Sequence, residues 1–309
     1  MTSLVASRLR VGERPTRRRR SLSGPLGTVL LLLPAVAAFG FLFVYPMIGV
    51  AAESVTLPEP GIGNYVSMFT DGYTLPILIR TFWVALVVAV FTIALAFPYA
   101  YLMTISGPRW AAVLMTVALI PFWSNATAKN FGLLVLFQRD GLLDRFLSFF
   151  GIHYPLIGTT QGVMIAMIQV LLPFAVLPLY ARLGQVNRRL LDAAQGLGAS
   201  RARSFWGIYV PLSMPGVAAS FTLVFILALG FYVTPAMLGT PQESLIAQLI
   251  MARLQVVLDF GGAGAIGVLL LVVTLLLLGL SQFVSARLAA GRDRSSTADS
   301  VRTIGGGVG

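Results

Sequence analysis

The most regular feature of the sequence is a series of long apolar stretches separated by short polar segments. A helix needs about 20 mainly apolar residues to cross the hydrocarbon core of a bilayer. Six stretches reach this length, at residues 26–52, 75–103, 110–137, 163–183, 212–238 and 263–288. The pattern therefore predicts an all-α membrane protein in which residues 26–288 form one domain of six transmembrane helices. Polar residues interrupt the third and fourth stretches, so the ends of these two are the least sharply defined.

Both ends of the chain are polar and are predicted to be disordered. Residues 1–25 are rich in arginine and contain Pro15, and residues 289–309 are rich in serine, threonine and glycine. The arginines at 17–20, followed by an apolar run, resemble a cleavable signal peptide. The run continues to Ala52, however, well past the apolar length of such a signal, which favours an uncleaved anchor.

The composition agrees with a chain whose solvent is mostly lipid. Hydrophobic residues make up 57% of the chain and charged residues 11%, whereas soluble domains carry about 25% charged residues. The chain has no cysteine, which excludes disulfides, zinc-thiolate sites and iron–sulfur clusters.

The charge distribution predicts the orientation of the chain in the membrane. A net charge of +11 could indicate either a nucleic-acid partner or cations gathered in cytoplasmic loops. With the N-terminus inside, 17 of the 22 basic residues fall on the cytoplasmic side, and seven of the 11 acids fall outside. The positive-inside rule accepts this topology and rejects its inverse. We therefore expect both termini in the cytoplasm, a multi-pass protein of the inner membrane, and no nucleic-acid partner.

The segment between the fourth and fifth stretches, residues 184–210, is expected to form two short amphipathic helices. We call it the 184–210 loop. Helical spacing defines the first helix through Val186, Leu190, Leu191, Ala194 and Leu197, and the second through Ala202, Phe205, Trp206 and Tyr209. Gly196 or Gly198 can end the first helix in a left-handed conformation, and Ser200 is a good N-cap for the second. Pro211 and Pro215 are expected to mark the junction with the fifth span.

Two amphipathic helices in a cytoplasmic loop either lie on the bilayer surface or dock on another protein. The spacing of specific residues favours docking. The pattern resembles the "EAA" loop of binding-protein-dependent ABC importer permeases, and seven residues carry it: Asp192, Ala193, Ala194, Gly198, Ile208, Val210 and Pro211. Asp192 stands where the family has Glu, and Val210 where it has Leu. Both changes keep the charge or the apolar character.

Other parts of the chain resemble the same family, at residues 81–83, 97–101, 121–124, 139–144 and 172–180. Residues 232–241 are similar to the spermidine/putrescine permease branch, which has a comparable Thr-Pro-Ala-Leu-Leu-Gly stretch. Lys129 departs from the arginine of the family's third-span motif, and this change keeps the charge but loses bidentate geometry.

The resemblance implies a type I ABC importer transmembrane-domain fold and several partners. These are ATP-binding subunits that hold ATP and magnesium, a second related permease subunit, a periplasmic solute-binding protein and the lipid bilayer. The residues implied to couple to the ATPase are Asp192, Ala193, Ala194, Gly198, Phe205, Ile208 and Pro211. The sequence itself offers no phosphate loop, because no Gly-rich segment precedes its one lysine, Lys129. We therefore expect a transport subunit without cofactors of its own.

The cargo that the resemblance implies is a polyamine such as spermidine or putrescine. A flexible polycation is recognised by carboxylates and aromatic faces, and Trp123, Tyr232, Glu243 and Asp259 are chemically suitable and near the outer halves of the spans. Each has a plainer explanation: the aromatic residues can be interfacial anchors, and the acids can face a binding protein. Iron, sulfate or thiamine could travel on the same scaffold.

Two other function classes are less well supported. A secondary transporter carries ionisable groups at mid-membrane, whereas the acids of this chain are confined to loops. A metal-dependent enzyme needs several clustered ligands, and the one histidine, His153, has no second histidine or cysteine to share a metal. We predict no catalytic residue and no metal site.

Overall fold

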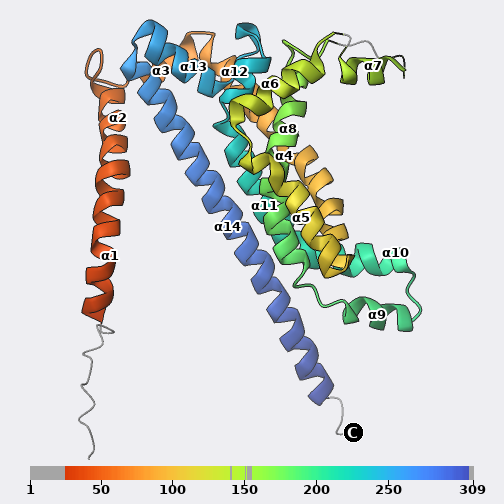
Figure 1. Ribbon diagram of the computed structural model, residues 1–309. Helices are drawn as coiled ribbons and strands as arrows, with labels where there is room; N and C mark the ends of the chain where they lie inside the picture. The colour runs from red at the N-terminus through yellow and green to blue at the C-terminus, as the bar shows by residue number, and fades with distance from the viewer. Residues whose placement is uncertain (1–24, 140, 150, 152–154, 306–309) are drawn as a thin grey trace, which may run out of the picture. The chain divides into compact units, whose positions relative to one another are not determined.

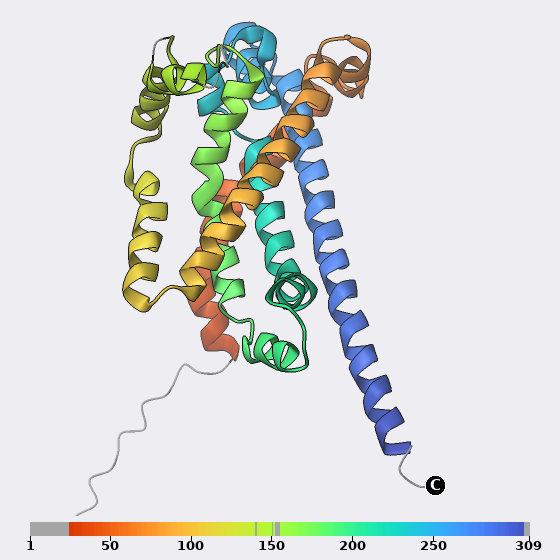
Figure 2. The ribbon, with the colours of Figure 1, turned by 90° about the vertical axis from the view of Figure 1, so that its right-hand side faces the viewer.

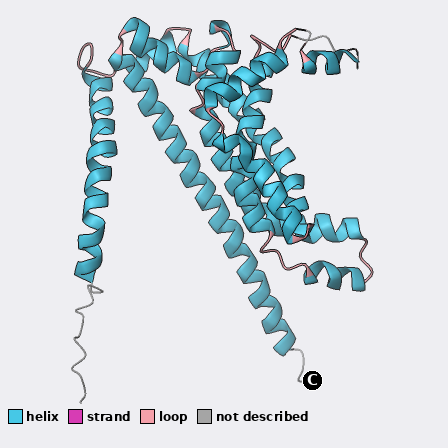
Figure 3. Ribbon diagram, in the orientation of Figure 1, coloured by secondary structure: helices cyan, strands magenta, loops and turns pink. Residues whose placement is uncertain are grey.

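A computed structural model describes residues 25–139, 141–149, 151 and 155–305 of the chain. The expectations for His153 and for the tail at residues 1–24 fall outside these ranges. Across them, every regular element is a helix (Figure 3). The chain divides into two compact units, Met1–Gly49 and Val50–Gly309.

The first unit contains most of the first predicted span. It consists of α1 (Pro25–Phe39), a π-helical turn (Gly40–Val44) and the start of α2 (Tyr45–Thr56). The stretch Leu31–Thr56 is long and apolar enough to cross a membrane, and its most apolar window has no buried residue. Such exposure is expected of a helix that is surrounded by lipid or that packs against a helix of another subunit.

The second unit contains the other spans. Four helical stretches meet the length and hydropathy needed to cross a membrane: Thr74–Ile105, Thr160–Leu183, Arg201–Leu229 and Phe260–Gln282. They correspond to α4 (Thr74–Ile105), α8 (Thr160–Leu183), α10 (Arg201–Ser204) with α11 (Val210–Leu229), and the first half of α14 (Phe260–Gly305). A fifth is a bent pair, α5 (Pro108–Trp123) and α6 (Ala126–Phe137). Together with the first span this confirms a six-span, all-α architecture.

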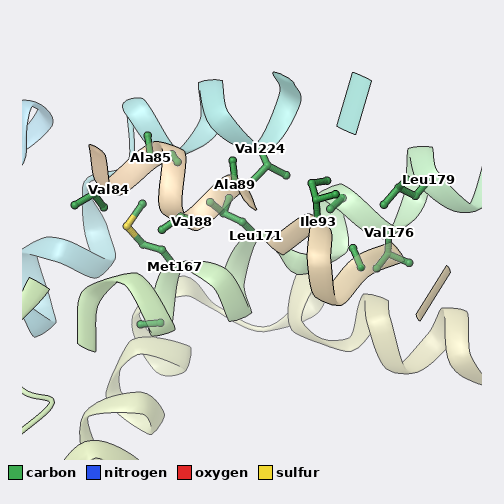
Figure 4. Close-up of a cluster of buried hydrophobic side chains, with 14 of the residues drawn as sticks. Val84, Ala85, Val88, Ala89, Ile93, Met167, Leu171, Val176, Leu179 and Val224 are labelled. Carbon is green, nitrogen blue, oxygen red and sulfur yellow. The ribbon is translucent and has the colours of Figure 1, made fainter. Parts of the chain in front are cut away.

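The core of the second unit is the contact between α4, α8 and α11. Small and β-branched residues of α4 such as Ala85, Val88 and Ala89 are fully buried there, against Leu171 of α8 and Val224 of α11 (Figure 4). Helices in a membrane gain little from hydrophobic burial, and small side chains let their backbones approach closely enough to pack well.

The third predicted span is not one straight helix. The axes of α5 and α6 differ by 100°, because Ser124 has an extended backbone (ψ 140°) and Asn125 starts a new helix. The Asn125 carboxamide oxygen accepts the Thr127 N–H at 2.8 Å and so caps α6. The single helix predicted over 110–137 is therefore wrong.

Two other predicted boundaries also differ. The fifth span ends at Leu229 rather than residue 238, because Gly230 caps it and α12 (Val233–Leu238) is a separate short helix. At the C-terminus α14 continues to Gly305, so residues 289–305 are helical where a disordered tail was expected. No proline occurs between Phe260 and Gly305, so every residue of this stretch has the backbone N–H that a continuing helix needs.

The short elements of the second unit gather at its two ends. At one end, which we call the α13 end, lie α3 (Gly63–Thr70), α6, α7 (Leu142–Phe149), α12 and α13 (Ile246–Ala252), with the start of α14 (Figures 1 and 2). At the opposite end, the α9 end, lie α9 (Arg189–Gly196) and α10. The spans therefore separate two groups of polar, irregular structure.

Candidate functional site

The first helix of the 184–210 loop ends in a turn that only one of its two glycines makes. Gly198 has a positive φ of 90°. Its N–H donates to the Gln195 carbonyl at 3.0 Å, and the Ala199 N–H donates to the Ala194 carbonyl at 3.0 Å. This pair of hydrogen bonds around a left-handed residue is the Schellman motif. The structure thus selects Gly198, and not Gly196, as the residue that turns the chain.

The second helix of the loop begins as predicted and ends differently. The Ser200 hydroxyl accepts the Arg203 N–H at 3.3 Å, which confirms Ser200 as the N-cap. A π-helical turn, Phe205–Tyr209, then joins α10 to α11 without a break. Pro211 lies in the first turn of α11, at the expected junction with the fifth span, whereas Pro215 lies inside that helix and no break occurs at either proline. A π turn is one of the local adjustments by which membrane helices accommodate a proline.

Aromatic rings attach the second part of the loop, residues 201–210, to the C-terminal end of α4. We call this part the returning limb. The Tyr101 ring meets the edges of Phe205 and Tyr209, each with ring centroids 5.2 Å apart. Phe205 and Tyr209 stack on one another at 5.5 Å. The Tyr209 hydroxyl donates to the carbonyl of Leu183, at the end of α8, at 3.4 Å.

A polar contact attaches the first part of the loop, residues 184–197, to the same helix. We call this part the leading limb. The Arg188 guanidinium donates through Nη2 to the Thr104 hydroxyl at 3.0 Å. A cavity of about 280 Å³ lies between the end of α8, the leading limb and α11, and it is lined by Arg182, Gln185, Val186, Asn187, Leu190, Leu212, Pro215 and Gly216. The loop is therefore fixed at both of its limbs.

The outer face of the loop exposes large apolar side chains. Leu197 is 91% exposed and Trp206 is 69% exposed. Of the seven residues predicted to couple to a partner, Asp192, Ala193 and Gly198 are exposed, and four are half-buried: Ala194, Phe205, Ile208 and Pro211. The motif did not identify Leu197 and Trp206 as exposed contact residues. The sequence feature that could have identified them is the presence of two large apolar side chains in an otherwise polar loop.

At the α13 end, an ion-pair network joins three elements. The Arg253 guanidinium lies 3.3 Å from a carboxylate oxygen of Asp71 and 3.2 Å from one of Asp259. Partial burial works to raise the pKa of Asp71, but hydrogen bonds from the Thr74 hydroxyl and from the N–H groups of Thr74 and Tyr73, together with Arg253, lower it below its ordinary value. The network fixes the end of α13 to the starts of α4 and α14.

The four residues proposed for the cargo path differ in their surroundings. Trp123 is 91% exposed, beside the break between α5 and α6. Tyr232 is exposed at the start of α12. Glu243 accepts a hydrogen bond from the Thr160 hydroxyl, and Asp259 is held by Arg253 and by the Gly262 N–H at 2.7 Å. None of the four lines the cavity beside the 184–210 loop, or either of two cavities at the α13 end, each of which is lined by Tyr73, Pro241 and Ser244 among others.

Several polar contacts at the α13 end were not predicted. The Thr234 hydroxyl of α12 donates to the Asn130 carboxamide oxygen of α6 at 2.9 Å, and both side chains are buried. Thr81 of α4 accepts the Ile246 N–H at 2.9 Å and so caps α13, and the neighbouring Arg80 donates to the carbonyl of Gln242. These partners lie more than 100 residues apart in the chain, so no local pattern could have paired them.

Comparison with known proteins places this architecture in a family. The family described as "Binding-protein-dependent transport system inner membrane component" matches residues 110–290, which is more than half of the chain. The chain belongs to this family. The permease is thus an inner-membrane subunit of an importer, as the pattern in the 184–210 loop predicted.

Individual relatives agree with this assignment. The permease is 29% identical to the spermidine/putrescine transport system permease protein PotB of Haemophilus influenzae over 224 residues, 70% of this chain and 77% of that one. It is 28% identical to the inner membrane ABC transporter permease protein YdcU of Escherichia coli over 241 residues, 70% and 76% of the two chains. A solved bacterial alginate ABC transporter, crystallised with an alginate-bound periplasmic protein, contains a chain of the same fold, with a TM-score of 0.69, 19% identity, and 84% and 94% of the two chains covered.

Proposed function

We propose that this permease carries polyamines such as spermidine and putrescine across the inner membrane, driven by ATP-binding subunits docked on its 184–210 loop. A second, related permease would complete the pathway, and a periplasmic solute-binding protein would deliver the cargo. ATP and magnesium would be bound by the docked subunits. The observation that carries the proposal is the loop itself, fixed to the spans on its inner face and exposing Leu197 and Trp206 on its outer face.

The chemistry of the exposed face suits a protein partner. Tryptophan is one of the residues that most often anchor protein interfaces, and Leu197 adds exposed apolar area on the same loop. Here they are surrounded by charged residues, namely Asp192 and the exposed arginines Arg188, Arg189, Arg201 and Arg203. A short helical knob with an apolar centre and a charged rim fits a groove on another subunit.

Docking is tested by placing a charge at the centre of this face. Leu197→Asp is expected to abolish co-purification of the ATP-binding subunits while the permease still inserts, because the side chain is exposed and supports no packing within the chain. Leu142→Asp, at a leucine 76% exposed on α7 at the opposite end, is the matched control. ATP-binding subunits that co-purify in full with Leu197→Asp would overturn the docking role.

The charges at the two ends support the proposed orientation. At or near the α9 end, five arginines (Arg182, Arg188, Arg189, Arg201 and Arg203) accompany one acid, Asp192, whereas at the α13 end Arg80 and Arg253 accompany three acids, Asp71, Glu243 and Asp259. Under the positive-inside rule this distribution supports a cytoplasmic α9 end, and the proposed topology has both termini in the cytoplasm as well. Because the chain has no cysteine, Leu197→Cys and Leu142→Cys each introduce a unique thiol. An impermeant maleimide added to spheroplasts should label Leu142→Cys alone, and labelling of Leu197→Cys would reverse the orientation.

The cargo is supported by relatives and by surface chemistry. PotB relatives are named for spermidine and putrescine, and carboxylates at the α13 end, including Glu243, suit a polycation that approaches from outside. Isothermal titration of the solute-binding protein that co-purifies with this permease, against spermidine, putrescine, ferric iron, sulfate and thiamine, decides between cargo classes. Heat on adding polyamines alone is expected. Binding of iron, sulfate or thiamine in their place would keep the importer and replace the cargo.

A further inference from the structure

The C-terminal end of α4 touches both limbs of the 184–210 loop. Tyr101 and Thr104 are three residues apart, so they project from the same face of the helix. Tyr101 meets Phe205 and Tyr209 on the returning limb, and Thr104 accepts a hydrogen bond from Arg188 on the leading limb. One turn of α4 therefore bridges the two sides of a loop that the chain itself connects only to α8 and α11.

The contact on the returning limb falls in the π-helical turn. Phe205 and Tyr209 are the first and last residues of that turn, and they present stacked rings to Tyr101. Tyr209 is 1% exposed. π turns inside helices are uncommon and occur often at functional sites. Here the turn places two aromatic rings where α4 can hold them.

The opposite end of α4 touches the elements of the α13 end. Arg80 donates to the carbonyl oxygens of Gln242 and Ser244, and Thr81 caps α13 by accepting the Ile246 N–H. Thr74, the first residue of α4, accepts from Arg253 at 3.1 Å. The 32 residues of α4 form one continuous helix, about 48 Å long at 1.5 Å per residue. A single helix thus connects the loop with α13 and with the turn Pro241–Glu243 that precedes it.

We propose that α4 is a third transmission arm of the importer, which moves with the 184–210 loop through Tyr101 and Thr104 and carries that motion to α13 and to the short turn Pro241–Glu243 before it. Tyr101 and Thr104 act as positioning residues, since each acts by holding another residue of the loop. This inference rests on the proposed docking of ATP-binding subunits on that loop. It adds α4 to α8 and α11, the two helices that the loop joins covalently.

The first experiment measures coupling in the complete transporter, purified with its ATP-binding subunits and its solute-binding protein. Tyr101→Leu removes two ring contacts and is expected to lower the stimulation of ATP hydrolysis by loaded binding protein about fivefold to tenfold. Tyr101→Phe keeps the ring and should stay within about twofold. Thr104→Val keeps the shape of the side chain but removes the hydroxyl that accepts from Arg188 and donates to the Tyr101 carbonyl at 2.7 Å, and it should lower stimulation about threefold.

Tyr99→Leu is the matched control on the same helix. Tyr99 faces α5 instead of the loop, and its hydroxyl donates to the Leu114 carbonyl at 2.6 Å. It controls for the loss of an aromatic residue from α4. Equal losses of stimulation in Tyr99→Leu and Tyr101→Leu would overturn the inference, because the effect would then come from α4 packing in general.

The second experiment measures the motion directly. Leu102→Cys on α4 and Gln195→Cys on α9 are exposed positions in a chain that has no cysteine of its own, so paired spin labels report one distance within this permease. The distance distribution should be the same in the resting and vanadate-trapped transporter. Adding Tyr101→Leu should broaden it. A distance that shifts on trapping in the otherwise unchanged protein would show that α4 and the loop move separately, which overturns the proposal.

The outcomes separate this inference from the proposed function. If Leu197→Asp retains its ATP-binding subunits, the docking role of the loop is wrong, regardless of the ATPase stimulation measured for Tyr101→Leu. Where Leu197→Asp loses the subunits and Tyr101→Leu keeps full stimulation, docking stands and the α4 arm fails. Loss of the ATP-binding subunits from Tyr101→Leu would also overturn the arm, because Tyr101 would then serve docking instead of transmission.

Discussion

The backbone N–H of Ala199 donates a hydrogen bond to the carbonyl oxygen of Ala194, and the two atoms lie 3.0 Å apart. This bond closes over Gly198, whose φ of 90° lets the chain reverse between α9 and α10. The direction in which α10 leaves the turn, and therefore the relative placement of Leu197 and Trp206, depends on that one backbone conformation.

Gly198→Ala is expected to weaken the loop through its backbone alone. A Cβ at this position would meet no atom within 4 Å, so the cost comes from the left-handed conformation, about 1–2 kcal/mol for an L-residue. The binding-protein-stimulated ATP hydrolysis of the purified transporter should fall. Gly196→Ala is the matched control, because it also has open space, lies within α9 and has no positive φ. Equal activity of the two variants would contradict a role for the turn.

The features predicted well from the sequence are those that depend on local composition. A membrane span must satisfy its backbone within itself, so apolar length alone indicates most of the spans. The N-cap at Ser200 and the glycine turn after α9 were also predictable, because capping is decided by neighbouring residues. The choice between Gly196 and Gly198 needed the structure, since both can adopt the required conformation.

The features that the sequence did not predict are those that leave no mark on local composition. Residues on both sides of Ser124 and Asn125 are apolar enough to continue a span, so the 100° bend between α5 and α6 leaves little trace in hydropathy. The hydrogen bond from Thr234 to Asn130 joins residues 104 apart in the chain. The pattern in the 184–210 loop likewise gave no information on Tyr101, because that residue belongs to another helix.

The Asn130–Thr234 hydrogen bond is expected to hold α12 against α6. Thr234→Val keeps the shape of the side chain but removes the donor to a buried carboxamide oxygen, which typically costs about 1–3 kcal/mol. The thermal denaturation temperature of the purified permease should fall accordingly. Thr116→Val is the control, because Thr116 is exposed and donates within its own helix, to the Ala112 carbonyl. A drop of the same size in Thr116→Val would mean that the buried pair contributes nothing specific.

Asp71 is expected to make the stability of the α13 end depend on acid pH. Its pKa is lowered in the folded state from an ordinary 3.8. Its stabilising contribution is therefore present above that ordinary value and is lost as the pH falls through the lower folded-state pKa.

The measurement compares denaturation temperatures of the unchanged permease and Asp71→Asn from neutral pH down to about pH 3. The difference between them should be constant near neutrality and should narrow at the acid end. Glu59→Gln, at an exposed acid between α2 and α3, serves as a control for losing one negative charge. A difference that persists unchanged to the lowest pH would show that the Asp71 carboxylate is not the stabilising group.

Trp123 and Asp259 were both candidates for the cargo path, and their surroundings now separate them. Trp123 is 91% exposed, so Trp123→Ala should leave the denaturation temperature unchanged and lower spermidine uptake about twofold to fivefold, the effect of one cation–π contact. Asp259 binds Arg253 and the Gly262 N–H, so Asp259→Asn should lower the denaturation temperature, with uptake reduced only in proportion to folded protein. Uptake per folded molecule distinguishes the two roles, because a partner in cargo transport changes this ratio and a structural partner does not. Unchanged uptake in Trp123→Ala, or a loss per molecule in Asp259→Asn at normal stability, would reverse the assignment.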